Sequence, residues 1–459
     1  MNIKYVRYSS GTPAYCVSQA AYLYASVGAS AKIGVGILSK TFSKNIEIWG
    51  KDNSPVRVYY HIEDGVLRTS CTRGKEFITQ GGWTSYWTSP GSRYFNPAGV
   101  GSYFDASAGT GGAVVPIYTY TLDDANRATI TGYNGSAAAL YIPGEIDGHE
   151  VVAIGDRAFE NRTDLRTVMI PDSVTEMGGY AFNNCTNLSN VTLSKNLESM
   201  GSSAFGNCDG LTQIEIPKSL DIGGNYYLGA FSDCANIKKV TFERGTTKIA
   251  SSLFCGCTGI EKIDIPDTVT IIQDYAFKEC KNLSTVNIPE SVTEIGSKAF
   301  YECISLSNVN IPDSVTKIGG YAFYQCKNLV NVTLSKNLEK MDCNAFGNCD
   351  GLTQIEIPKS LDVGGDYYSG AFADCANLKK VTFERGTTKI ASNLLCGCTG
   401  IEKIDIPDTV TVIQDYAFKE CKNLSTVNIP ENVTEIGSKA FNECISLSNV
   451  NIPDSVTKI

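Results

Sequence analysis

Apolar residues recur along the chain at a fixed spacing, which predicts a repeat. The intervals between marker residues are 23 residues, with two exceptions of 26. The marker is a phenylalanine, usually after alanine, and is once a leucine: Phe159, Phe182, Phe205, Phe231, Phe254, Phe277, Phe300, Phe323, Phe346, Phe372, Leu395, Phe418 and Phe441. A period of about 20 to 50 residues held this closely is typical of a solenoid. Residues 180–318 also reappear nearly unchanged as 321–459, so a block of six repeats is duplicated whole.

Each unit contains the pattern of a short strand and a return segment. Leu283, Val286 and Ile288 follow the spacing LxxVxI, whose alternation is that of a half-buried strand. Pro289 ends this strand because proline has no N–H for a ladder hydrogen bond. A second apolar set within 292–300 returns the chain over the other side of the coil. One coil cannot bury these residues alone, so we predict stacked coils that each add a strand to a parallel sheet.

The repeats resemble the BspA-like leucine-rich repeat, the 23-residue class that ends in AFxxC. Phrases such as IPDSVTEMG at 170–178 and IPESVTEIGSKAFYECISL at 288–306 carry the resemblance, which covers about 128–459. It implies an α/β-type leucine-rich-repeat solenoid with a parallel β-sheet on one face, about 13 coils long and spanning 118–459. It also implies a surface-exposed protein that binds partners, often in a host-associated bacterium.

The residues before the repeats have a different character. Trp49, Trp83 and Trp87, all the tryptophans of the chain, precede the repeats. We predict a small all-β, barrel-like module over 1–80 and a linker or extension rich in glycine, serine and aromatic residues over 81–117. Residues 14–79 resemble bacterial Src-homology-three-like domains, which attach proteins to cell walls. Ser70 and Cys71 replace the usual glycine and aromatic residue, a departure that bears on ligand binding.

Charge separates the same two parts. Residues 1–117 hold 11 Lys/Arg and 6 Asp/Glu, a net charge of +5, against 28 and 42, or −14, in 118–459. The overall charge of −9 argues against a nucleic-acid partner, which needs a clustered basic field. No apolar run approaches the ~20 residues that span a bilayer, and the start lacks a secretory signal. A location at the cell surface, or secretion, is therefore implied by the resemblance alone. The chain stops in mid-coil, from which we expect a truncated chain.

Twelve of the 17 cysteines share one phase of the repeat, and we call them the thiol ladder. Each lies three residues after the marker residue: Cys185, Cys208, Cys234, Cys257, Cys280, Cys303, Cys326, Cys349, Cys375, Cys398, Cys421 and Cys444. We predict buried reduced thiols at an inward position, with a ladder of disulfides or metal ions as the alternative. Cys255 and Cys396 form CGC with ladder members, for which local packing is the expectation.

No catalytic constellation is visible in the sequence. The two histidines, His61 and His149, have no neighbouring serine or cysteine in a nucleophile setting. The phosphate-binding loop, the dinucleotide fingerprint and the HExxH zinc motif do not occur. We therefore predict neither an enzyme nor a cofactor or metal site.

Binding is predicted on two features, of which the first is a polar stripe. If Val286 and Ile288 point inward, Asn287 points outward, and the same phase is polar throughout both blocks. The stripe is Thr192, Glu215, Thr241, Asp264, Asn287, Asn310, Thr333, Glu356, Thr382, Asp405, Asn428 and Asn451. Among these, the predicted ligand-binding residues are Glu215, Asp264, Asn287, Asn310, Glu356, Asp405 and Asn428. Solenoids commonly bind along such a face, although a merely solvated face gives the same pattern.

The second feature is the insertion in each 26-residue unit. The two units read SLDIGGNYYLGAF and SLDVGGDYYSGAF, so tyrosines lie on glycine-rich inserts: Tyr226, Tyr227, Tyr367 and Tyr368. Insertions map to loops on one face, often the binding face. Tyrosine offers a large contact area at low entropic cost, but each pair could instead pack one ring onto the coil.

These features together predict a non-enzymatic surface protein that binds protein or glycan partners on its solenoid. The N-terminal module would bind a cell-wall polymer. Two alternatives remain open: a structural spacer that presents this module, and an accessory region of a larger cell-wall enzyme.

Overall fold

The computed structural model describes residues 117–220, 229–363, 370–448 and 450–459 in full, and the backbone of ten strands before them. The chain divides into two compact units. The first comprises 1–118 and 134–143, and the second comprises 119–133 and 144–459.

The ten strands of residues 3–94, all in the first unit, pair antiparallel. They are β1 (Ile3–Arg7), β2 (Pro13–Val17), β3 (Tyr22–Ser26), β4 (Ser30–Gly34), β5 (Phe42–Trp49), β6 (Pro55–Glu63), β7 (Val66–Cys71), β8 (Glu76–Thr79), β9 (Trp83–Tyr86) and β10 (Gly91–Tyr94). Strands β10, β7, β6 and β5 form one sheet in that order, and β1–β2, β3–β4 and β8–β9 pair separately. Strands β9 and β10 fall inside the predicted linker or extension. The side chains of His61 and of Ser70 and Cys71 lie outside the described residues, so the likeness to a Src-homology-three-like domain stays a prediction.

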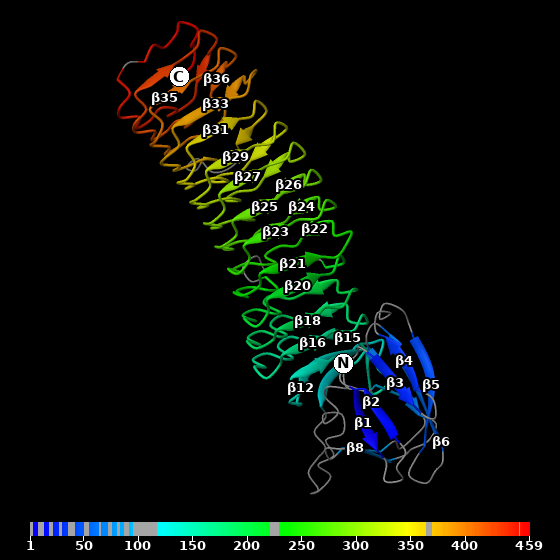
Figure 1. The fold of residues 1–459 in the computed structure, drawn as a ribbon. Helices are drawn as coiled ribbons and strands as arrows, with labels where there is room; N and C mark the ends of the chain where they lie inside the picture. The colour runs from blue at the N-terminus through cyan, green and yellow to red at the C-terminus, as the bar shows by residue number, and fades with distance from the viewer. Residues whose placement is uncertain are drawn as a thin grey trace. The chain divides into compact units, whose positions relative to one another are not determined.

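The second unit is a solenoid of about 13 turns with parallel strands, and the predicted leucine-rich-repeat fold is confirmed. The predicted LxxVxI strands form a first strand row: β16 (Thr167–Met169), β18 (Asn190–Thr192), β20 (Gln213–Ile216), β21 (Lys239–Phe242), β23 (Lys262–Asp264), β25 (Thr285–Asn287), β27 (Asn308–Asn310), β29 (Asn331–Thr333), β31 (Gln354–Ile357), β33 (Lys380–Phe383), β35 (Lys403–Asp405) and β37 (Thr426–Asn428). Figure 1 shows this row along one side of the stack. Its hydrogen-bonded pairs are β16–β18, β20–β21, β23–β25, β27–β29, β31–β33 and β35–β37.

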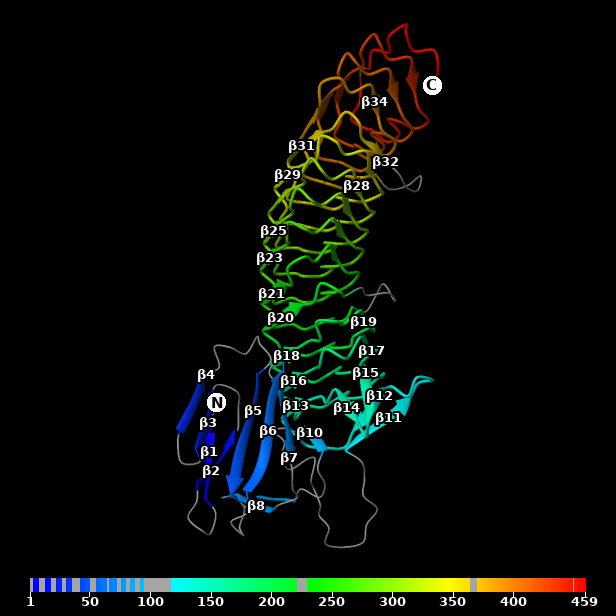
Figure 2. The same cartoon turned by 90° about the vertical axis from the view of Figure 1, so that its right-hand side faces the viewer.

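A second strand row lies in the return segment, where the sequence predicted only an apolar set. It consists of β15 (His149–Ile154), β17 (Glu176–Met177), β19 (Ser199–Met200), β22 (Lys248–Ile249), β24 (Ile271–Ile272), β26 (Glu294–Ile295), β28 (Lys317–Ile318), β30 (Lys340–Met341), β32 (Asp362–Val363), β34 (Lys389–Ile390), β36 (Val412–Ile413) and β38 (Glu435–Ile436). Further strands near the start of the solenoid are β11 (Tyr118–Leu122), β12 (Ala128–Tyr133), β13 (Ala139–Tyr141) and β14 (Glu145–Ile146). Figure 2 shows the two rows on opposite sides of the stack. Among the described residues, the hydrogen-bonded strands of this row run from β15 to β19, from β22 to β32 and from β34 to β38.

The marker residues fill the centre of the coils. Ten consecutive phenylalanine rings, from Phe159 to Phe372, are fully buried and stack with 4.7–5.9 Å between neighbouring centroids. Leu395 interrupts this phenylalanine column, and Phe418 stacks on Phe441 beyond it. Each ring needs the coil before and after it for burial, which is why the repeats are stable only as a stack.

The thiol ladder runs beside the phenylalanine column. Each ladder thiol donates a hydrogen bond of 2.9–3.3 Å to the carbonyl oxygen of the marker residue one coil earlier, for example from Cys303 to Phe277. Every ladder sulfur except that of Cys444 belongs to a residue with no exposed surface. A small side chain with a weak donor therefore fits this position, as the sequence predicts.

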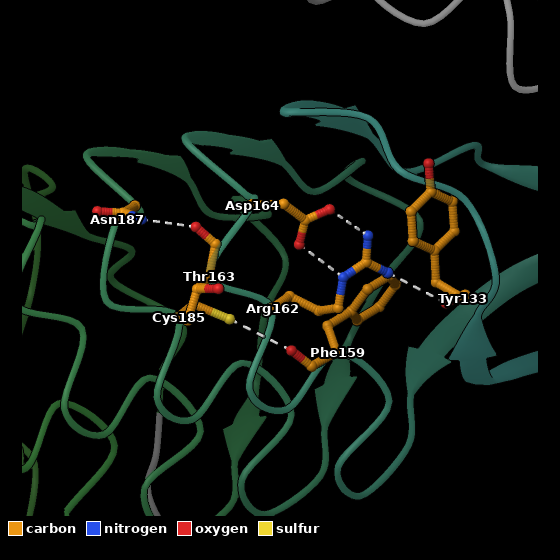
Figure 3. Close-up of polar contacts among 7 residues, drawn as sticks. All are labelled: Tyr133, Phe159, Arg162, Thr163, Asp164, Cys185 and Asn187. Carbon is orange, nitrogen blue, oxygen red and sulfur yellow. Dashed lines mark hydrogen bonds and ion pairs between the residues drawn. The ribbon is translucent and has the colours of Figure 1, made fainter.

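Arg162 occupies the ladder position of the first coil, where the other coils have cysteine. Its guanidinium binds both oxygens of Asp164, at 2.8 and 2.6 Å, and donates to the carbonyl of Tyr133 at 3.1 Å. The guanidinium also lies over the Tyr133 ring, 4.9 Å from its centroid. Figure 3 shows these contacts beside the bond from Cys185 to Phe159. The thiol ladder therefore ends at a charged side chain that is paired with Asp164 and lies against Tyr133.

The residue that follows each insert must be glycine, because a neighbouring coil packs closely against it. A Cβ atom added to Gly370 would lie 1.5 Å from the carbonyl oxygen of Asn393, and one added to Gly229 would lie 1.5 Å from that of Ser252. The obstacle is backbone in both cases, so the coil itself would have to move.

We expect Gly370→Ala to lower the free energy of unfolding by ~3 kcal/mol, because the added methyl group overlaps a neighbouring coil. Gly386→Ala is the control. Its φ is +92°, but nothing lies within 4 Å of the added atom, so only the left-handed backbone opposes it, at a cost of ~1–2 kcal/mol. Urea unfolding followed by circular dichroism measures both variants. Equal losses would mean that the coil contact at Gly370 relaxes freely.

Candidate binding face of the solenoid

The polar stripe is exposed along the first strand row. Alternation places the neighbours of most stripe residues in the core: Ile263 and Ile265 are buried, whereas Asp264 between them is exposed. The predicted ligand-binding residues of the stripe all have this position, on β20, β23, β25, β27, β31, β35 and β37: Glu215, Asp264, Asn287, Asn310, Glu356, Asp405 and Asn428. The structure thus gives these side chains one common face.

A groove of about 370 Å³ opens on this face between β18 and the pair β20–β21. Strands β18 and β20 belong to different hydrogen-bonded pairs, so the sheet is split where the groove lies. Its lining comprises Ser189, Asn190, Val191, Thr192, Gln213, Ile214, Glu215, Lys239 and Thr241. Three of these residues, Thr192, Glu215 and Thr241, belong to the predicted stripe.

Besides Ser189, the sequence analysis missed three polar lining residues that lie on the strands themselves, Asn190, Gln213 and Lys239. Each lies two positions before a stripe residue, so the same strand alternation directs it outward. This signal was present in the sequence. The hollow around which these side chains gather is not visible in the repeat pattern.

The groove offers donors and acceptors of several kinds. Asn190 donates from Nδ2 to Ser189 Oγ at 3.2 Å, and Ser189 Oγ donates to the carbonyl of Arg166 at 3.1 Å. Within the described part of the chain, no ion pair or hydrogen bond holds the Glu215 carboxylate or the Lys239 ammonium group. Both charged groups are therefore available to a ligand.

The tyrosines of the two inserts, Tyr226, Tyr227, Tyr367 and Tyr368, lie outside the described residues. Their role in binding stays a prediction.

The histidine and the two extra cysteines that the sequence analysis considered, His149, Cys255 and Cys396, lie in packed or hydrogen-bonded positions. Nδ1 of His149 lies 2.8 Å from the carbonyl oxygen of Asn126, and its ring is 6.2 Å from that of Tyr120. Cys255 and Cys396 are buried, and burial raises the pKa of each thiol to about 11. Over the described ranges, no three His, Cys, Asp or Glu side chains gather in a way that could hold a metal ion. The same residues include no helix long and apolar enough to cross a bilayer.

Comparison with known proteins agrees with this architecture. The sequence model described as "BspA type Leucine rich repeat region" matches residues 152–270, 247–368 and 367–459. A leucine-rich repeat protein from Bacteroides ovatus is 26% identical, with 76% of this chain and 99% of that chain covered and a TM-score of 0.56. A leucine rich cell surface protein from Faecalibacterium prausnitzii is 29% identical, with 74% and 94% covered and a TM-score of 0.40. No curated protein matches the chain. Because the repeat matches span most of its length, the chain belongs to the family of BspA-type leucine-rich-repeat proteins.

Proposed function

We propose that this chain is a non-enzymatic binding or adhesion protein of the cell surface, whose solenoid holds protein or glycan partners on the first strand row. The observation that carries the proposal is the groove lined by stripe residues and by the free charges of Glu215 and Lys239. The surface location is an expectation from the family resemblance. The basic N-terminal module is proposed to bind an anionic cell-wall polymer.

The stripe suits a ligand that lies along the solenoid. Successive coils repeat at a strand spacing of ~4.8 Å, so a ligand running along the axis meets a new outward side chain at each step. A hydrogen bond to a charged group contributes ~1.5–3 kcal/mol, about twice the contribution of a neutral one. The other two stripe carboxylates, Asp264 and Asp405, form ion pairs with Lys262 and Lys403 at 2.9 Å. Glu215 and its counterpart Glu356 are therefore the stripe residues whose loss should weaken binding most.

The test is a double substitution, Glu215→Ala with Glu356→Ala, in the full chain. A screen of extracellular-matrix proteins and glycans by biolayer interferometry first supplies a ligand for wild type. The double variant is expected to bind that ligand at least ~10-fold more weakly, because it loses charge-assisted hydrogen bonds. Its melting temperature should stay unchanged, since both side chains are exposed.

The matched control is Glu290→Ala with Glu431→Ala. These two exposed carboxylates are also 141 residues apart, and they lie just outside the first strand row, so the control makes the same change in net charge. Equal affinity of wild type and the stripe variant would rule out the proposed face. A wild-type chain that binds nothing in the screen would favour the spacer role.

A further inference from the structure

The duplicated block repeats the lining residues of the groove, and we call the second set the second copy. The shift of 141 residues that relates the blocks carries the lining onto residues 330–333, 354–356, 380 and 382. Eight of the nine lining residues are identical in the two copies, and Ser189 alone is replaced, by Val330. The strands also correspond, because β20 pairs with β21 in the same register as β31 with β33.

We infer that the solenoid is bivalent and that a neutral, repeating polysaccharide lies along it and occupies both copies at once. This inference rests on the proposed function and names the class of ligand for the same face.

The fixed separation between the two copies favours a polymer as the ligand. They are six coils apart, or ~29 Å at a strand spacing of ~4.8 Å. Both belong to the same compact unit of stacked coils, so their separation is fixed by the fold. A globular protein presents a given epitope once, whereas a polymer of identical units presents the same group at regular intervals. A single polymer can therefore fill both copies, and the second contact becomes intramolecular.

The chemistry of the lining favours a neutral polyhydroxylated ligand. Its polar side chains are hydroxyls, amides, one carboxylate and one ammonium group, so the formal charge of the lining is zero. Sugar hydroxyls both donate and accept hydrogen bonds and match this mixture. A polyanion would require a basic cluster. A protein partner would normally insert aromatic or aliphatic anchors into apolar pockets, but only Val191 and Ile214 are apolar here.

The single difference between the copies makes them unequal. In the first copy the Asn190 amide donates to Ser189 Oγ. Val330 offers no acceptor, and the Asn331 amide donates instead to Asn308 Oδ1 of the preceding coil, at 2.6 Å. Val330 itself is 45% exposed. The second copy therefore presents an apolar group where the first presents a hydroxyl, and its amide is engaged elsewhere.

The experiment compares polymers with short oligosaccharides on the full chain. The probes are dextran, mannan, xylan and β-1,3-glucan, each as a long polymer and as fragments of two to four sugars. The proteins are wild type, Glu215→Ala, Glu356→Ala and the double variant, with Glu290→Ala as the charge control. Biolayer interferometry measures apparent affinity for the polymers, and isothermal titration calorimetry measures stoichiometry with the fragments.

We expect one of the four glycans to bind. Each single variant should then lose ~100-fold or more in apparent affinity for the long polymer, because avidity disappears with either copy. Two fragments should bind per wild-type chain, and one per single variant with the affinity of the remaining copy unchanged. Val330→Ser should bring the second copy closer to the first in fragment affinity.

Two results would overturn the inference. A single variant whose polymer affinity falls by no more than two-fold would show that the copies do not act together. Failure of all four polymers to bind would overturn the inference that a neutral polysaccharide of these kinds occupies the groove. If a protein ligand of wild type were then lost in the double variant, the proposed binding face would stand although its ligand class was wrong.

Discussion

Raising the pH from 8 to 10.5 is expected to destabilise the solenoid steeply, because several of its ladder thiols, Cys280, Cys303, Cys326 and Cys444 among them, must stay protonated to remain buried. Burial raises the pKa of Cys280, Cys303 and Cys326 above the usual range for a thiol, and that of Cys444 to about 11. In the unfolded chain a thiol loses its proton near pH ~8.5. The stabilising contribution of each such thiol is therefore complete below that pH and is lost as the pH rises towards the folded pKa.

The expected slope is large because many thiols act together. Each thiol that keeps its proton only in the folded state removes about 1.4 kcal/mol of unfolding free energy per pH unit above ~8.5. Urea unfolding in the presence of a reductant, at intervals from pH 7 to 10.5, measures the loss. A stability that stays level to pH 10.5 would contradict burial of the ladder.

A single substitution separates the contribution of one thiol to the pH dependence of stability from the contributions of lysines and tyrosines, which titrate over the same pH range. Cys303→Ala removes one buried thiol and is expected to reduce the slope by about 1.4 kcal/mol per pH unit, whatever its stability at pH 7. A cavity changes stability equally at every pH, so the slope separates the two effects. An unchanged slope would show that Cys303 does not titrate differently in the folded and unfolded chains.

Phe254→Ala is expected to lower the free energy of unfolding by ~3–5 kcal/mol, since it removes a fully buried ring from the middle of the phenylalanine column. The ring has aromatic neighbours in both adjacent coils, Phe231 at 5.8 Å and Phe277 at 5.9 Å between centroids. Circular dichroism during urea unfolding measures the loss.

The second block contains the natural control for this substitution. Leu395 takes the place of Phe254 there and is also fully buried. Phe254→Leu should therefore cost ~1.5 kcal/mol or less, because a large apolar side chain still fills the site. If the leucine variant were as unstable as the alanine variant, ring stacking rather than filled volume would govern the column.

The sequence alone predicted the solenoid and the inward or outward direction of most strand residues. Both follow from periodicity: a period of 23 residues reveals the coil, and a period of two residues within LxxVxI separates Ile263 from Asp264. The buried thiols follow from the same phase argument. Part of the candidate groove was predicted too, since Thr192, Glu215 and Thr241 are stripe residues.

Only the tertiary structure revealed the second strand row and the groove. A strand of two residues, such as β26, is too short to leave a periodic pattern, and it forms because neighbouring coils pair with it. The groove depends on how the outward side chains of β18, β20 and β21 lie in space, and nearly identical repeats do not show where such side chains enclose a hollow. The contacts of Arg162, at the end of the thiol ladder, and the hydrogen bond from Asn331 to Asn308 also could not be predicted from the sequence. Each side chain finds its partner in another segment of the fold, and its own repeat does not specify that partner.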